Sequence, residues 1–212
     1  MVDFAATAGI ARATIADDEG LLYPGVRQQR TVIVTPDYVL DVFRVQSDKE
    51  HTYDWTFHPL DEKGLTSSTL AFEPVAPTTG PAPKKDRGQD AHAAWITNGR
   101  RTSTDWTWQA EWADRGIPLR LTMLGEPGTE IRLWDFQRDD QFNPPPLPML
   151  QVRRHARSTD FVALYQSGRI PSAHVDLEMR NQQTGALVAT IHIAGHTDSW
   201  IVPPLGDEKK TH

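Results

Sequence analysis

Apolar residues recur at every second position along most of this chain, and almost never at the three-and-four spacing of a helix. A side-chain period of two belongs to a β-strand, whose successive side chains point to opposite faces of a sheet. Segments with this period lie at 31–45, 105–112, 117–124, 129–136, 149–156, 160–166, 172–180 and 185–193. Turns rich in glycine, proline and asparagine separate several of them. The pattern predicts an all-β protein, an antiparallel β-sandwich of jelly-roll type with two packed sheets.

The length of 212 residues suits a single β-sandwich domain over residues 1–212. A chain of this size can bury roughly 70% of the surface that its unfolded form exposes, so a real core is available. The segment at about 73–92 is too rich in proline and glycine for a strand. We expect it to be a surface loop or part of a site.

The composition limits the partners that this chain can bind. Its net charge is -6, and lysine and arginine never run for more than two residues, so we expect neither nucleic acid nor a membrane as a partner. The chain has no cysteine, which excludes disulfides, thiolate nucleophiles and cysteine metal sites. Residues 1–20 lack the basic start and apolar run of a signal peptide. The sequence therefore predicts a soluble chain without its own export signal.

A hairpin is predicted at 31–45, with its turn at Pro36 and Asp37. Folding the chain about this turn places Arg30 and Thr31 near Val42 and Phe43, and Arg30 comes within diagonal reach of Asp41. Arg30 and Asp41 would then form a structural ion pair, or Arg30 would serve a site.

Three tryptophans alternate in the segment at 105–112, where Trp106, Trp108 and Trp112 are predicted to share one strand face. Three rings on one face are typical of a core stripe or of a platform on which sugar rings stack. These residues are therefore candidates for substrate binding, and an exposed platform would support that role.

The segment HTYDWTFHP at 51–59 alternates aromatic and polar residues. In an extended strand one face would hold Tyr53, Trp55 and Phe57, and the other would hold Asp54, Thr56 and His58. One interpretation is a strand whose polar face bonds to backbone, or Asp54 to His58. The other places Tyr53 and His58 with a basic residue at a cleft, where they suit proton abstraction beside a carboxylate.

Other catalytic and metal-binding motifs are absent from the sequence. The two histidines of HIAGH, at 192–196, would lie about 13 Å apart on a strand, which excludes a shared metal unless Gly195 folds the chain back. The chain has no His-Glu-x-x-His, no phosphate-binding glycine loop and no Gly-x-Ser-x-Gly elbow. No metal or other cofactor is predicted.

The order of several motifs is similar to that of a known family. YPGVRQQRTVIVTPDYVLDVFRV, HTYDWTFH, LTMLGEPGTEIRL and QVRRHARSTDFVALYQ follow one another over roughly residues 20–170. This succession resembles the C-terminal β-sandwich region of the heparinase II/III-like polysaccharide lyases. The positions that carry the resemblance are Arg30, Tyr38, Val39, Asp41, Asp54, His58, Arg153, Arg154, Thr159, Phe161 and Val162.

The resemblance implies a module of enzymes that cleave uronate-containing polysaccharides by β-elimination, in a periplasmic or extracellular location. Complete members carry a helical toroid with the main catalytic residues, and often a metal held by histidines and an aspartate. The sequence matches neither region, so no catalytic residue or metal ligand is carried over. The resemblance implies an acidic polysaccharide or oligosaccharide as ligand, with a helical domain or self-association completing the molecule.

Three hypotheses of function follow. The favoured one is the sandwich portion of such a lyase, incomplete without its helical half. The second is a carbohydrate-binding or scaffold sandwich with the three tryptophans exposed. The third is a small self-contained lyase, whose candidate catalytic residues Tyr53, His58, His92 and Arg30 would converge in one concave site.

Overall fold

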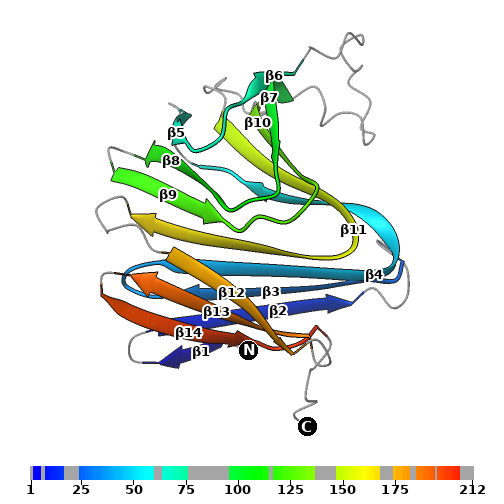
Figure 1. The fold of residues 1–212 in the computed structure, drawn as a ribbon, viewed down its shortest axis with the longest axis vertical. Coiled ribbons are helices and arrows are strands. Elements are labelled where there is room, and N and C mark those ends of the chain that lie inside the picture. Colours follow the sequence, from blue (N-terminus) through cyan, green and yellow to red (C-terminus); the bar gives the residue numbers. More distant parts are fainter. Residues whose placement is uncertain are drawn as a thin grey trace, which may run out of the picture. The chain divides into compact units, whose positions relative to one another are not determined.

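The computed structural model describes residues 2–5, 8–16, 24–59, 64–75, 96–114, 117–136, 147–167, 174–181, 185–193 and 195–205. Within these ranges the regular elements are all strands (Figure 1). They are β1 (Val2–Ala5), β2 (Ala8–Ala16), β3 (Val26–Val34), β4 (Val39–Phe57), β5 (Leu65–Ser68), β6 (Glu73–Pro74), β7 (Ile96–Thr104), β8 (Trp108–Asp114), β9 (Ile117–Met123), β10 (Thr129–Phe136), β11 (Leu147–Ser167), β12 (His174–Asn181), β13 (Ala186–Ile193) and β14 (His196–Val202). The all-β prediction is confirmed. None of the described segments forms a helix able to cross a membrane.

The chain divides into two compact units. Unit 1 comprises residues 1–53, 120–124 and 155–212, and unit 2 comprises residues 54–119 and 125–154. The two longest strands, β4 and β11, each contribute one part to each unit. The single domain over residues 1–212 therefore stays a prediction.

Unit 1 contains two sheets that pack face to face. One is part of an 11-stranded sheet and has the strand order β1-β2-β3-β4-β11, and the other is a 3-stranded sheet with the order β12-β13-β14 (Figure 1). The buried core between them consists of Ile33, Tyr38, Leu40, Val42, Val162, Leu164, Leu187, Ala189, Ile191, Ile193 and Val202. Burying each large aliphatic side chain contributes about 1.5–3 kcal/mol, so this apolar layer holds the two sheets together. The predicted β-sandwich is confirmed.

The hairpin of β3 and β4 has the predicted register, in which Arg30 lies opposite Phe43 and Thr31 opposite Val42. Asp41 is 2% exposed and accepts two hydrogen bonds from Arg30, at 2.9 Å from Nε and 2.6 Å from Nη2. The bond to Asp41 raises the pKa of the Arg30 guanidinium. The predicted ion pair is confirmed, and it satisfies a carboxylate that would otherwise be buried alone.

β11 is one strand where the sequence suggested two, at 149–156 and 160–166. Residues 157–159 contain neither glycine nor proline, so nothing in them interrupts the pleat. Asp160 in the middle of β11 accepts a hydrogen bond of 2.9 Å from Arg44 Nε, and Arg44 Nη1 also binds the carbonyl of Pro203 at 3.0 Å. These bonds tie β4, β11 and the segment after β14 together within unit 1.

Unit 2 has the strand order β4-β11-β10-β7-β6, and β8 pairs with both β5 and β9. Its buried residues include Trp55, Trp108, Ala110, Trp112, Ile131, Leu133, Met149, Leu150 and Val152. Most of the segment predicted as a loop at 73–92 lies outside the described residues. Its first two residues differ from that prediction, because Glu73 and Pro74 form β6 and pair with Arg101 and Arg100.

Alkaline pH should destabilise unit 1 through Tyr38. This residue is 3% exposed, and its hydroxyl donates to Asp198 Oδ2 at 2.6 Å and accepts from Trp200 Nε1 at 2.7 Å. Burial, and then the bond to Asp198, raise the pKa of Tyr38. A raised folded-state pKa adds stability below the unfolded value of about 10, and this stability is lost as the pH rises above it.

Urea denaturation at about pH 9 and about pH 11 measures this effect. We expect a lower free energy of unfolding at the higher pH, and a smaller drop in the Tyr38→Phe variant. Part of the drop should remain in that variant, because burial also raises the pKa of Tyr165. Equal drops in the two proteins would show that Tyr38 is not responsible.

Candidate functional site

The outer side of unit 2 is polar because side chains alternate along β10. Ile131 and Leu133 are 0% and 4% exposed and belong to the core. Glu130, Arg132 and Trp134 point to the opposite side of the same strand and are partly exposed. This side of β10 is therefore a polar surface with one aromatic ring.

Strand pairing extends this surface across three strands. Glu130 lies opposite Ser103 of β7 and Arg153 of β11, and Arg132 lies opposite Arg101 and Gln151 in the same way. Residues directly opposite each other in an antiparallel pair share a face. Arg153 extends the surface to β4, where it binds Asp54 through Nε at 2.7 Å and Nη2 at 2.8 Å. We call this surface the polar face: Asp54, Arg101, Ser103, Glu130, Arg132, Trp134, Gln151 and Arg153.

Charges of both signs are paired on the polar face. The bond to Asp54 raises the pKa of Arg153, and the nearby Glu130 acts in the same direction. Arg132 Nε binds Glu130, and its guanidinium lies 6.0 Å from the centre of the Trp134 ring. Trp134 Nε1 in turn donates to Gln151 Oε1 at 3.2 Å. These bonds hold the side chains in defined positions, which favours recognition of a ligand with little loss of side-chain entropy.

Gly99 of β7 allows the Trp134 ring to lie where it does. A Cβ atom at Gly99 would stand 2.2 Å from Cζ3 of Trp134, which is far inside van der Waals contact. The register of β7 and β10 shifts at this point, between Leu133 and Asp135. Such an irregularity is typical of a β-bulge, which re-aims a side chain.

A hollow of about 510 Å³ adjoins the polar face at the start of β10. It is lined by Ala71, Glu73, Arg101, Thr102, Ser103, Gly128, Thr129 and Glu130. Its volume falls within the range of small-molecule sites, although its lining is more polar than that of a typical drug-binding pocket. Arg101 offers a forked donor, the two glutamates offer acceptors, and the hydroxyls can both donate and accept. These groups suit a polyhydroxylated ligand, and Arg101 is the cationic group in the lining that could pair with a carboxylate.

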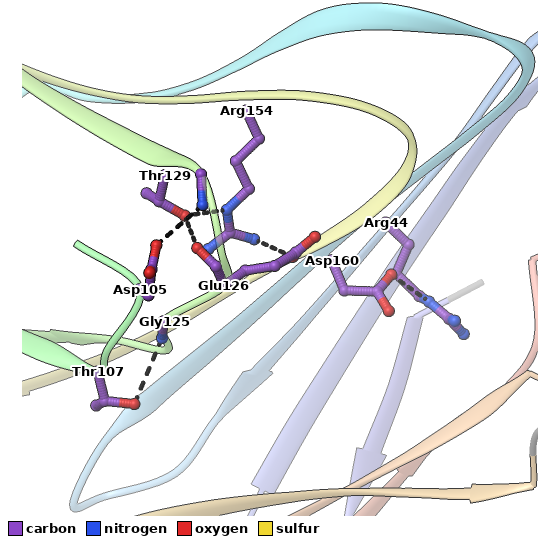
Figure 2. A network of polar contacts seen from close by, with 9 residues as sticks. Arg44, Asp105, Thr107, Gly125, Glu126, Thr129, Arg154 and Asp160 are labelled. Atoms are coloured by element: carbon purple, nitrogen blue, oxygen red, sulfur yellow. Dashed lines mark hydrogen bonds and ion pairs between the residues drawn. The ribbon is translucent and has the colours of Figure 1, made fainter. Parts of the chain in front are cut away.

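A buried arginine, Arg154, is bonded to Glu126 and to Thr129, which lines the hollow (Figure 2). Arg154 is 2% exposed, and it donates to Thr129 Oγ1 at 2.8 Å and to Glu126 Oε2 at 2.7 Å. Thr129 Oγ1 also donates to the Glu126 carbonyl at 2.6 Å, and the N–H of Gly128 donates to Asp105 at 3.0 Å. This network fixes the turn that enters β10.

The four residues proposed as catalytic stay predictions, because they belong to different units or lie outside the described residues. Arg30 and Tyr53 belong to unit 1, and the Arg30 guanidinium is bound to Asp41. His58 follows β4 in unit 2, and His92 lies outside the described residues. Burial raises the pKa of Tyr53, which opposes its use as a base, and burial lowers the pKa of His58, which favours the neutral imidazole that a base requires.

The alternation predicted at 53–58 is present. Tyr53 and Trp55 are buried and Phe57 is half-buried, whereas Asp54, Thr56 and His58 are exposed. The partner of Asp54 is Arg153, and not the backbone or His58 as the sequence suggested. The reason is that β4 pairs with β11, which brings a guanidinium to this position, and the local pattern of β4 does not reveal that pairing.

The three tryptophans at 105–112 do not share one face. Trp108 and Trp112 are 1% and 0% exposed and belong to the core, whereas Trp106 is 80% exposed. The predicted exposed platform of three rings is therefore wrong, because β8 begins only at Trp108 and residues 105–106 form a bend. Trp106 alone is accessible to a ligand.

The two histidines of HIAGH lie on opposite faces of a hairpin. Gly195, with φ of +85°, does fold the chain back. His192 pairs with Thr197 and His196 pairs with Ile193, so the two imidazoles point to different sides. No group of three histidine, cysteine, aspartate or glutamate side chains in the described ranges is arranged to hold a metal ion.

Sequence reasoning missed the hollow and most of the polar face. The alternation of Glu130, Arg132 and Trp134 between apolar residues was a visible signal that these side chains share a face. The signal did not show which strands lie on either side of them. Arg101 and Gln151 are separated from Arg132 in the sequence and meet it only through strand pairing.

No family model and no curated protein sequence matches this chain. Its fold is shared with part of solved structures of polysaccharide lyases. The heparan sulfate lyase HepC from Pedobacter heparinus has a TM-score of 0.57 and 14% identity, over 97% of this chain and 27% of that chain. A heparinase III structure has a TM-score of 0.58 and 7% identity, over 96% of this chain and 26% of that chain. At this identity the similarity shows the fold, and this chain spans about a quarter of the length of those enzymes.

Proposed function

We propose that this chain is the saccharide-binding β-sandwich part of a polysaccharide lyase of the heparinase II/III-like group. The observation that carries the proposal is the hollow beside the polar face, where Arg101 lies with two glutamates and several hydroxyls. Ligands that present a carboxylate among many hydroxyls, as uronate polysaccharides do, match this set of donors and acceptors. The fold shared with heparan sulfate lyase and heparinase III supports the same assignment.

In this proposal the guanidinium of Arg101 binds the uronate carboxylate through two parallel hydrogen bonds. Glu73 and Glu130 accept bonds from sugar hydroxyls, and Ser103 and Thr102 complete the hydroxyl contacts. Binding in this way orients the polysaccharide, and a helical catalytic part, as the resemblance implies, abstracts the proton next to the carboxyl group. A periplasmic or extracellular location would give access to such substrates.

The Arg101→Gln variant tests this assignment. We expect it to bind an acidic oligosaccharide, such as a heparan sulfate or alginate fragment, about 10- to 150-fold more weakly than the unmodified protein. This range corresponds to the loss of a hydrogen bond between charged groups, about 1.5–3 kcal/mol. Isothermal titration calorimetry at low and high salt measures both the affinity and its electrostatic part.

The matched control is Arg157→Gln, which removes the same charge from an exposed arginine of unit 1. We expect its affinity to stay within about twofold, since it changes only the net charge of the protein. Equal loss in both variants would mean that binding depends on net charge alone. An unmodified protein that binds no uronate polysaccharide would contradict the proposed function.

A second candidate function is a self-contained lyase, and the state of His58 favours it. Partial burial lowers the pKa of this imidazole, which favours the neutral form that a base requires. A lyase assay on the purified chain, which follows the ultraviolet absorbance of the unsaturated product, distinguishes the two functions. Product formation that is lost in a folded His58→Ala variant would favour the self-contained lyase, and the absence of product together with binding would favour the saccharide-binding part.

A further inference from the structure

Trp106 is the most exposed large apolar side chain in the part of the chain that the structure describes. Its exposed fraction is 80%, against 44% for Ile117 in the same unit. Single exposed apolar residues are common on protein surfaces and by themselves need no function. What distinguishes Trp106 is the way in which its backbone is held.

Side chains and neighbouring turns hold the backbone of Trp106 on several sides. Thr104 Oγ1 accepts a hydrogen bond from the Trp106 N–H at 3.1 Å and donates one to the Trp106 carbonyl at 3.3 Å. A Cβ atom at Gly125 would lie 2.2 Å from the Trp106 carbonyl carbon, so the turn at Gly125 packs directly on this bend. Because both backbone polar groups of Trp106 are bonded, the bend has few alternative conformations.

The residues beside Trp106 are tied to the same turn. Asp105 accepts a hydrogen bond from the Gly128 N–H at 3.0 Å, and Thr107 Oγ1 accepts one from the Gly125 N–H at 3.4 Å (Figure 2). The indole is therefore carried on a bend that is fixed from both ends. A ligand that stacks on it would cost little ordering of the backbone, which favours affinity.

Trp106 stands next to the hollow. The bend begins directly after β7, where Ser103 lines the hollow, and it is bonded to Gly128, which also lines it. Trp106 is three positions after Ser103, a path of at most about 11 Å along the chain. One short oligosaccharide can therefore contact both Trp106 and the groups of the hollow.

We propose that Trp106 is the stacking platform for a sugar ring of the same acidic polysaccharide whose uronate binds Arg101 in the hollow. An indole has a broad apolar face that suits the C–H face of a pyranose, and its N–H remains free to bond with a hydroxyl or water. This inference rests on the proposed function and adds to it a second contact point, which sets the direction of the polysaccharide on unit 2. A sugar is favoured over an apolar partner because the bend that carries the ring is bonded to Gly128 of the polar hollow.

The test compares Trp106→Ala, Trp106→Phe and the control Ile117→Ala by calorimetric titration with heparan sulfate and alginate oligosaccharides of increasing length. We expect Trp106→Ala to lose about tenfold or more in affinity for the longer oligosaccharides, as is usual for a tryptophan that becomes buried when its ligand binds. Trp106→Phe should keep part of the affinity, since it retains a ring, and Ile117→Ala should match the unmodified protein. The salt dependence of binding should be the same in Trp106→Ala as in the unmodified protein.

Fluorescence gives an independent measurement on the unmodified protein. Bound oligosaccharide should protect one tryptophan from quenching by acrylamide, and this protected fraction should be missing in Trp106→Ala. If Arg101→Gln weakens binding while Trp106→Ala does not, the proposed function stands and the inference on Trp106 is wrong. If the unmodified protein binds no acidic oligosaccharide, both are wrong. A concentration-dependent dimer that Trp106→Ala abolishes, with unchanged sugar affinity, would assign the ring to a second copy of the chain and would also overturn the inference.

Discussion

Replacing Glu126 with alanine should lower the free energy of unfolding by about 3 kcal/mol, because it removes the carboxylate that binds a buried guanidinium. Arg154 is 2% exposed, and its Nη1 lies 2.7 Å from Glu126 Oε2. Removing one partner of a buried ion pair typically costs about 3–5 kcal/mol. We expect the lower end of this range, since the Glu126 side chain is 35% exposed and Arg154 keeps its bond to Thr129.

Urea denaturation of Glu126→Ala beside a Glu50→Ala control measures this effect. Glu50 is 61% exposed and lies 3.7 Å from His155, so we expect its removal to change stability by less than about 0.5 kcal/mol. In the double variant Glu126→Ala with Arg154→Met, no unpaired charge of this pair remains buried, and part of the lost stability should return. A Glu126→Ala variant as stable as the control would show that Arg154 does not depend on this carboxylate.

The second large effect concerns the core of unit 2, where Trp112→Ala should cost about 3–5 kcal/mol. Trp112 is 0% exposed, and Phe57 packs edge-on against it with ring centres 5.6 Å apart. Truncation to alanine would leave a cavity that neighbouring side chains cannot fill. Urea denaturation followed by circular dichroism measures the loss.

Trp112→Phe should cost clearly less than Trp112→Ala, for two reasons. Phenylalanine fills most of the volume, and the indole N–H of Trp112 has no hydrogen-bond partner among the described residues, so its removal leaves no group unsatisfied. Trp106→Ala is the matched control, and we expect it to change stability by less than about 0.5 kcal/mol because its ring is in solvent. Equal losses in Trp112→Ala and Trp106→Ala would contradict the assignment of Trp112 to the core.

These two experiments also separate stability from recognition on unit 2. Trp112 is buried in the core, so its variants should lose stability, and those that remain folded should keep their saccharide affinity. Trp106 and Arg101 are exposed, so their variants should lose affinity and keep stability. The buried residues of unit 2 therefore serve as controls for the affinity measurements, and its exposed residues serve as controls for the stability measurements.

Local features of the sequence determined the strand content, the hairpin of β3 and β4 and the pairing of Arg30 with Asp41. A period of two shows which side chains share a face, and a short turn at Pro36 and Asp37 sets the register of the strands on either side. The same period correctly divided residues 53–58 into an aromatic face and a polar face. These features depend only on residues that are close in the sequence.

Only the tertiary structure decided the position of the hollow, the partner of Asp54 and the separation of Trp106 from Trp108 and Trp112. Asp54 meets Arg153 across 99 positions of the chain, and the hollow collects residues from β6, β7 and the start of β10. Pairing between distant strands is selected by the packing of the whole sheet, and the local pattern of one strand does not indicate which strand will pair with it. The alternation of side chains thus shows which residues of one strand share a face. The strand order shows which strands are neighbours, and it depends on contacts between distant parts of the chain that form together when the core is buried.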